Sequence, residues 1–178
     1  MNRKVDIRRE VRARIKQMSP EQMQSAAERI FSLIEQLDTF SQSECIALFA
    51  AMKDEVPTDI ALARWLQLGK RIVVPRVEGE IMRFYDYDPA RMTTGAFGIE
   101  EPIGDVECSP ADIDLIIVPA RAFTTSGIRL GRGGGFYDKY MSLPSFRAAK
   151  VGIAFECQIF STLPHDSHDI LVDKVIFA

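Results

Sequence analysis

A glycine-rich stretch offers the clearest chemistry in this sequence. Four of the five residues in Gly131–Gly135 are glycine, and Arg132 lies among them. The apolar run Leu115–Val118 precedes the stretch, and Phe136–Met141 directly after it can begin a helix. A strand, a glycine loop and a helix N-terminus in this order place main-chain amides around an anion. With Arg129 and Arg132 as additional donors, the pattern favours an anion site over a merely flexible turn.

This glycine stretch matches neither of two common nucleotide-binding motifs. It lacks the Gly-Lys-Ser/Thr of a P-loop, and Phe136 stands where a dinucleotide-binding loop has its last glycine. Hydrogen bonds to charged groups contribute about 1.5–3 kcal/mol each. Two arginines therefore fall short of the roughly 8 kcal/mol that micromolar binding requires. We expect further contributions from main-chain amides, a metal ion, or the basic stripe that Lys4, Arg8 and Arg12 form at helical spacing.

The basic residues of the chain gather in two segments. Residues 1–20 carry five more Lys and Arg than Asp and Glu, and residues 121–150 carry the same surplus, although the net charge is -3. This distribution suggests an anionic ligand held between the two segments. Charge alone fits two solvated basic faces equally well. A nucleic-acid partner would favour a larger basic surplus over the whole domain, so none is expected.

Three acidic residues are candidates for contacts with a ligand or a metal ion. Glu55 follows the expected strand Ile46–Ala50, and ligands of open α/β sheets bind beyond the carboxyl ends of the strands. Asp138 and Asp173 would suit Mg²⁺, a hard ion that carboxylates bind and that bridges phosphates. Each of the three has a simpler alternative as an exposed or capping acid.

Composition places the chain among ordinary globular proteins. Its 178 residues are 47% hydrophobic and 26% charged, so disorder is not expected. The charged beginning of the chain and its short apolar runs indicate neither a signal peptide nor a membrane span, and we expect a cytoplasmic protein with no membrane partner. The three scattered cysteines are typical of reduced thiols. His165 and His168, without a cysteine nearby, are a weak signal for zinc.

The order of the expected elements predicts an α/β fold. Ser19 and Pro20, followed by Gln22, are typical of a capped helix start. After residue 40 strands alternate with helices, which predicts a layered, mostly parallel sheet. We expect one domain, 1–178, with an N-terminal helical pair at about 3–37. The expected helices are 3–18, 20–37 and 58–68, with another that can begin at residues 136–141, and the expected strands are 46–50, 72–74, 81–87, 115–118, 151–155 and 175–177.

The stretch Gly127–Tyr140 resembles the signature of 5-formyltetrahydrofolate cyclo-ligases, also called 5,10-methenyltetrahydrofolate synthetases. The similarity extends in order over nearly the whole chain. Its supporting pieces are Lys4 and Arg8, Asp54-Glu55 with Thr58, Gly98–Pro102, Asp114–Pro119, Ala122-Phe123, Gln158, and His168-Asp169 with Val172-Asp173.

The resemblance implies a fold and a reaction. The implied fold is a three-layer α/β sheet like that of the ribose-phosphate isomerase and CoA-transferase group. In the implied reaction ATP phosphorylates the formyl oxygen of 5-formyltetrahydrofolate, nitrogen 10 attacks the activated carbon, phosphate leaves and the 5,10-methenyl ring closes. ADP and phosphate are released and Mg²⁺ is needed. Phosphoryl transfer requires mainly positioning and charge stabilisation, which a glycine loop with arginines can provide.

The resemblance also implies roles for individual residues. Arg132 is the candidate catalytic residue, and Asp138 and Asp173 match the magnesium ligands. Glu55 would accept hydrogen bonds from the pterin ring. The ATP-binding positions are Lys4, Arg8, Arg129, Leu130, Gly131, Arg132, Gly133, Gly134, Gly135, Phe136 and Tyr137. The folate-binding positions are Ala50, Glu55, Arg132, Gly133, Gly134, Gly135 and Phe136.

The sequence departs from the family pattern at several positions, none of which removes a proposed phosphate or metal contact. They are Ala120 for a usual glycine, Thr124 for a common aspartate, Phe136 for a frequent tyrosine, Lys139 for a frequent arginine, and the ending Val175–Ala178, which lacks the usual Thr-Glu.

Two other functions fit a glycine loop on this kind of fold. One is a nucleotide or phosphosugar sensor without turnover, against which Glu55 and the pair Asp138 and Asp173 argue, because a sensor needs no metal ligands. The other is a phosphosugar isomerase, which rests on fold analogy alone. It would need a general base, and we can nominate only Glu55.

Overall fold

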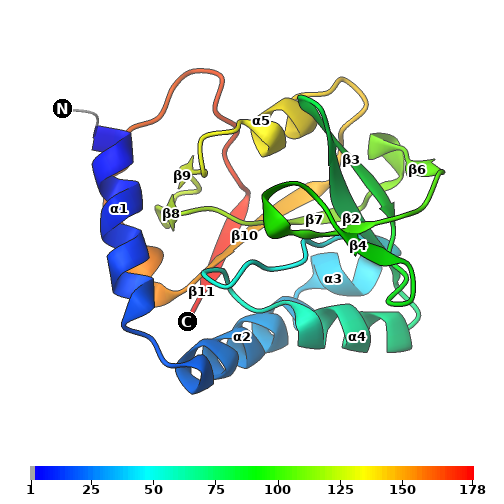
Figure 1. Cartoon of the computed structure of the whole chain (residues 1–178), viewed down its shortest axis with the longest axis horizontal. Coiled ribbons are helices and arrows are strands. Elements are labelled where there is room, and N and C mark those ends of the chain that lie inside the picture. Colours follow the sequence, from blue (N-terminus) through cyan, green and yellow to red (C-terminus); the bar gives the residue numbers. More distant parts are fainter. Residues whose placement is uncertain (1–2) are drawn as a thin grey trace.

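The computed structural model describes residues 3–178, so the first two residues of the expected domain lie outside the described residues. Figure 1 shows its helices and strands. In chain order these are α1 (Arg3–Lys16), α2 (Pro20–Glu35), α3 (Asp38–Gln42), β1 (Cys45–Ala47), α4 (Asp59–Gln67), β2 (Arg71–Glu78), β3 (Ile81–Asp86), β4 (Met92–Thr94), η1 (Ala96–Gly98), β5 (Glu100–Pro102), β6 (Glu107–Cys108), η2 (Pro110–Asp112), β7 (Leu115–Val118), β8 (Ala122–Phe123), β9 (Arg129–Leu130), α5 (Phe136–Met141), β10 (Ala149–Ala154), η3 (Glu156–Gln158) and β11 (Lys174–Phe177).

Seven strands form one mixed sheet in the order β11-β10-β7-β1-β2-β3-β6. The pairs from β11 to β2 are parallel, and the pairs β2–β3 and β3–β6 are antiparallel. Two small antiparallel pairs, β4–β5 and β8–β9, lie outside this sheet. The expectation of a mostly parallel sheet flanked by helices is confirmed.

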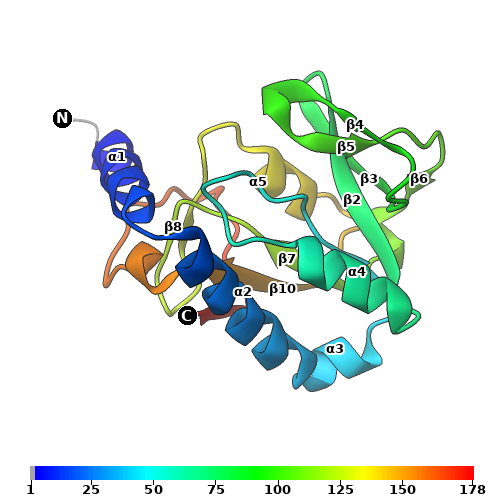
Figure 2. The same ribbon diagram turned by 60° about the horizontal axis from the view of Figure 1, so that its bottom comes forward.

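Alternate residues of the central strands face two different hydrophobic clusters. On β1, Ile46 belongs to the cluster that α2 and α4 cover, whereas Cys45 and Ala47 belong to the cluster under α5. Figures 1 and 2 show α2, α3 and α4 on one face of the sheet and α5 on the other. Because both faces are covered, the central strands are apolar without alternation, as the fully buried β7 is.

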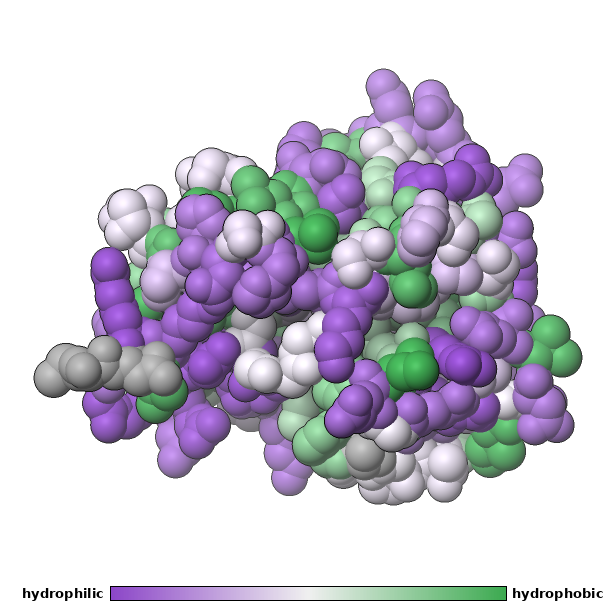
Figure 3. Space-filling view, turned by 90° about the horizontal axis from the view of Figure 1, so that it is seen from above, coloured by the Kyte–Doolittle hydropathy of each residue, from purple (hydrophilic) through white to green (hydrophobic). Residues whose placement is uncertain are grey.

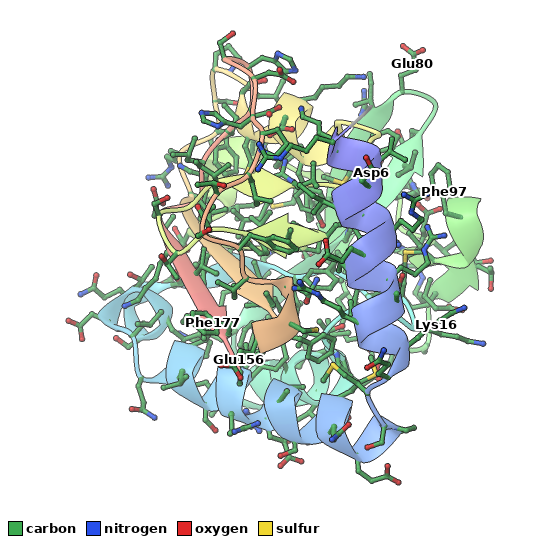
Figure 4. All side chains as sticks on the ribbon, turned by 90° about the vertical axis from the view of Figure 1, so that its left-hand side faces the viewer. Asp6, Lys16, Glu80, Phe97, Glu156 and Phe177 are labelled. Atoms are coloured by element: carbon green, nitrogen blue, oxygen red, sulfur yellow. The ribbon has the colours of Figure 1, made fainter. Side chains whose placement is uncertain are left out.

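The first two helices form where expected but contact different parts of the molecule. Ser19 and Gln22 make the predicted capping box, and α2 packs against β11 and α3. Helix α1 instead contacts η3 and β8. Figure 4 shows α1, with Asp6 and Lys16 near its two ends, in front of the body between β11 and the segment that carries Phe97. One face of α1 is therefore free to border a ligand.

Several elements differ from the expected ones in their length. Strand β1 ends at Ala47 rather than at Ala50, although Leu48 N still donates to Val73 O at 3.0 Å. Helix α1 ends at Lys16, where Gln17 and Met18 make tighter bonds to carbonyls three residues back. The residues that follow β1 are thus loop residues, and they lie at the carboxyl ends of the parallel strands.

The three cysteines are free thiols. Cys45 and Cys108 are buried with their Sγ atoms 4.0 Å apart. No helix within residues 3–178 is long and apolar enough to cross a membrane.

A glycine in β10 allows β8 to pack closely against the sheet. A Cβ atom on Gly152 would lie 2.5 Å from Cε1 of Phe123, a side chain that is fully buried. Phe123 pairs with Arg129 across β8–β9, and β9 leads directly into the glycine loop. The position of this loop therefore depends on the missing side chain at Gly152.

We predict that Gly152→Ala lowers the free energy of unfolding by about 1–3 kcal/mol, because the added methyl group overpacks the core against Phe123. Urea unfolding followed by circular dichroism measures this change. Gly104→Ala is the matched control, since its Cβ would meet only Tyr85 Cβ at 4.0 Å. Its unfolding free energy should be unchanged or raised by no more than about 1 kcal/mol. Equal effects of the two substitutions would contradict the packing argument.

Candidate active site

A cavity of about 920 Å³ lies between α1, the carboxyl ends of β1 and β7, the hairpin β2–β3 and the start of α5. This volume is at the upper end of the range for small-molecule sites. Seven basic and five acidic side chains among the described residues line it, so a surplus of positive charge remains for an anionic ligand.

The glycine loop forms one wall of the cavity. Gly133 and Gly135 have φ values of 114° and 72°, which residues other than glycine rarely adopt. Gly135 is the N-cap residue of α5. The main-chain amides of Arg132–Gly135 donate to no acceptor within residues 3–178. Arg8 Nε donates to the carbonyl of Gly131 at 2.8 Å, which fixes the loop against α1. The loop thus presents unused donors beside a basic helix.

The basic stripe of α1 borders the same cavity as the glycine loop. Lys4, Arg8 and Arg12 all line it, as the two-segment charge pattern suggested. Lys4 Nζ lies 2.6 Å from Asp166 Oδ2 and 3.7 Å from Asp169 Oδ2, so it joins α1 to the segment before β11. Figure 3 shows a mostly hydrophilic surface on the side of α1, with apolar residues in separate patches elsewhere. The two basic segments of the sequence are therefore close together in space.

Arg132 is held by two neighbouring carboxylates from the loop after β1. Its NH2 nitrogen lies 2.7 Å from Asp54 Oδ1 and 3.0 Å from Glu55 Oε1. The other Asp54 oxygen accepts from Arg121, whose side chain is only 6% exposed. Burial disfavours the charge on Asp54, but the hydrogen bonds from Arg132 and Arg121 outweigh it and lower the pKa of its carboxyl group. Asp54 is therefore charged at neutral pH.

Arg129, whose side chain is buried, makes an ion pair with the partly buried Asp138. Its NH2 nitrogen lies 2.7 Å from Asp138 Oδ1, which also accepts from the Ile170 amide at 3.0 Å. The Nε atom of Arg129 is buried and has no partner among the described residues. Tyr137, beside this pair, lines the cavity, and burial raises the pKa of its hydroxyl group, so it is neutral. The pair connects β9, which borders the cavity, to α5.

Part of the cavity lining is apolar. It includes Phe49 after β1, Val77 in β2 and Met82 in β3. Glu101 lines the cavity beside Val77 and accepts from the Val77 amide. Phe97, between β4 and β5, also lines it and is 69% exposed, with a φ value of 61°. The cavity thus offers cations and amides to an anionic group, and apolar side chains to an uncharged ring system.

All but one of the residues predicted for the site line this cavity. They are Lys4, Arg8, Ala50, Glu55, Arg129, Leu130, Gly131, Arg132, Gly133, Gly134, Gly135, Phe136, Tyr137 and Asp138. Asp173 does not line it. Its Oδ2 accepts from the Lys150 amide at 2.8 Å, and its Oδ1 lies 3.7 Å from Lys150 Nζ. The structure therefore does not bring Asp173 together with Asp138.

Sequence reasoning missed two features of the site. Arg121 lines the cavity directly after β7, and the rule about carboxyl ends that singled out Glu55 applies equally to it. The second feature is the group Phe97, Val77 and Met82, which carry no polar signal, so the sequence offered no reason to single them out.

An α/β protein with a glycine loop, a helix N-terminus and several arginines around one cavity belongs to the class of proteins that bind phosphorylated ligands. A family model identifies the particular family. The model of the 5-formyltetrahydrofolate cyclo-ligase family matches residues 1–178, and the chain belongs to this family.

Individual relatives agree with this assignment. The chain is 28% identical to the mouse 5-formyltetrahydrofolate cyclo-ligase, with 96% of this chain and 91% of the mouse protein covered. It is 28% identical to the Escherichia coli K12 enzyme of the same name, over 93% of this chain and 95% of that protein. The solved structure of Aquifex aeolicus 5,10-methenyltetrahydrofolate synthetase is 34% identical, with a TM-score of 0.86, and the match covers 98% of this chain and 89% of that one.

We predict that Arg129→Met lowers the free energy of unfolding by about 3 kcal/mol, because it leaves the charge of Asp138 without its partner. Chemical denaturation of both proteins measures the difference. Arg9→Met is a matched control, since Arg9 forms an exposed pair with Asp6 at 2.7 Å. That change should cost less than about 1 kcal/mol. If Arg129→Met costs no more than the control, this ion pair does not support the residues that line the cavity.

Proposed function

We propose that this chain catalyses the ATP-dependent conversion of 5-formyltetrahydrofolate to 5,10-methenyltetrahydrofolate, with release of ADP and phosphate. One observation carries the proposal: a single cavity is lined by unused amides and cations and also by apolar side chains. ATP and a reduced folate differ in the same way, since one is a polyanion and the other is largely a ring system. Family membership identifies the two substrates.

The triphosphate binds, in this proposal, along the glycine loop. The free amides of Arg132–Gly135 and the start of α5 supply neutral donors, and Arg132 supplies charge. Arg8 and Lys4 extend this surface from α1. Lys4 is paired with Asp166 and Arg132 with Asp54 and Glu55. Phosphate therefore competes with carboxylates for these cations.

The folate binds beside the apolar side chains, between the loop after β1 and the segment that carries Phe97. Glu55 and Ala50 also line the cavity. A carboxylate can accept from adjacent N–H groups of a pterin ring, which gives Glu55 its proposed role. Residues Arg132–Phe136 line the cavity and, in this proposal, contact both substrates. The terminal phosphate and the formyl group then meet at Arg132.

The chemistry requires positioning rather than a protein nucleophile. The formyl oxygen attacks the terminal phosphorus and ADP leaves. Nitrogen 10 then attacks the formyl carbon and gives up its proton, and phosphate leaves with the former formyl oxygen. Arg132 and the loop amides stabilise the negative charge on the transferred group. The apolar side chains of the lining exclude water, which would otherwise take the phosphoryl group.

When bound, Mg²⁺ would neutralise part of the phosphate charge. Asp138 fits this ion, because it is a carboxylate that lines the cavity beside the loop. Both of its hydrogen bonds fall on Oδ1, which leaves Oδ2 for the ion. Substrate phosphates and water complete a magnesium site of this kind. The second proposed ligand, Asp173, lacks this support because it lies outside the cavity lining.

We predict that the purified protein, mixed with ATP, Mg²⁺ and 5-formyltetrahydrofolate, generates the absorbance of the methenyl product. A spectrophotometric assay follows the reaction, and mixtures without ATP or without protein serve as controls. Product formation that stops without ATP supports the proposal. A folded protein that binds ATP but forms no product would instead support a nucleotide-binding protein without turnover.

We predict that Asp138→Asn needs more Mg²⁺ for half-maximal turnover than the unsubstituted protein, by about tenfold, because a neutral amide is a weaker ligand for a hard cation. Titration of Mg²⁺ at saturating ATP measures this concentration. Asp173→Asn is the matched comparison and should leave it unchanged. A rise in the Mg²⁺ requirement with Asp173→Asn alone would assign the ion to Asp173 instead.

A further inference from the structure

Arg132 forms ion pairs with two carboxylates, only one of which lines the cavity. Glu55 lines the cavity, and its oxygens accept from Arg132 and from the Met52 amide. Asp54 holds the same Arg132 nitrogen at 2.7 Å but is not among the described residues that line the cavity. A ligand in the cavity can therefore bind Glu55 in place of Arg132 without contacting Asp54.

Asp54 is anchored from its other side by Arg121. Two hydrogen bonds fix the main chain of Arg121. Its amide donates to Leu130 O at 2.8 Å, and its carbonyl accepts from Gln158 Nε2 at 3.1 Å. The Arg121 side chain is only 6% exposed and forms an ion pair with Asp54. Because a buried cation needs its counterion, Asp54 cannot turn away from Arg121 without leaving an unpaired charge.

A chain of alternating charges thus runs from the segment after β7 to the glycine loop, through Arg121, Asp54 and Arg132. We infer that Asp54 is a positioning residue: fixed by Arg121, it keeps the Arg132 guanidinium beside the phosphate-binding loop when the folate engages Glu55. This inference rests on the proposed function. The charge that Asp54 keeps at neutral pH, with its pKa lowered by both arginines, agrees with this role.

The first test is Asp54→Asn, measured for kcat and for KM of each substrate. We expect kcat/KM for ATP to fall about tenfold to hundredfold, because a displaced catalytic group costs rates of this order. The KM for 5-formyltetrahydrofolate should change less than about threefold, since Glu55 remains. Asp54→Glu should recover part of the loss, because it restores the charge. Asp86→Asn, which removes the partner of Arg71 outside the cavity, is the matched control and should leave turnover unchanged.

The second test is a double-mutant cycle with Arg132→Ala. If Asp54 acts through Arg132, adding Asp54→Asn to Arg132→Ala should cost little further activity. A purely structural role would reduce activity by the same factor in both backgrounds. Thermal unfolding identifies any variant that is not folded at the assay temperature. If Asp54→Asn is such a variant, Asp54→Glu takes its place in the cycle.

Three results would overturn the inference. These are turnover of Asp54→Asn equal to that of the unsubstituted protein, a lower KM for ATP with unchanged kcat, and effects in the double-mutant cycle that simply multiply. If the unsubstituted protein shows no turnover, the proposed function fails but the inference can still be tested. Calorimetric titration with Mg²⁺ and ATP should then show weaker binding by Asp54→Asn, and equal or tighter binding would contradict the positioning role.

Discussion

The contact between Arg132 and the acidic pair Asp54 and Glu55 is the constraint on which this site depends. A guanidinium group placed among main-chain amides would be repelled by the helix N-terminus beside it, because both carry positive charge. The carboxylates, at 2.7 and 3.0 Å, offset this repulsion and tie the glycine loop to the loop after β1. Arg132 is thus held beside the cavity by carboxylates. In the proposed function, phosphate replaces these carboxylates as the partner of Arg132.

The parallel sheet brings these loops together. Strands β1 and β7 are neighbours with Ile46 paired to Leu115, so their carboxyl ends meet at one edge. The segments that leave this edge carry Asp54 and Glu55 from β1, and Arg121 from β7. Each segment alone contains charges that would be ordinary surface residues. They form ion pairs because the pairing register of β1 and β7 brings residues that are far apart in the sequence within hydrogen-bonding distance.

The parts of the fold that the sequence predicted are those with a strong local signal. The apolar run Leu115–Val118 forms a strand with the predicted bounds, a helix begins at Phe136 as expected, and Ser19 caps α2 as its spacing indicated. The short strands β4, β5, β6, β8 and β9 were missed because a segment of two or three residues has no periodicity to detect. The residues proposed to bind phosphate were predictable from charge and glycine content. The ion pair of Asp54 with Arg121 was not, because these residues lie 67 positions apart and only the sheet register joins them.

Two kinds of ion pair border the cavity, and they differ in their contact with water. The Arg121 side chain is 6% exposed, whereas Lys4 and Asp166 are 28% and 55% exposed. Mobile ions screen exposed charges much more than buried ones. Raising the ionic strength therefore weakens the contact of α1 with the segment around Asp166 more than the contact between Arg121 and Asp54, because the Asp54 side chain is 29% exposed and that of Arg121 only 6%.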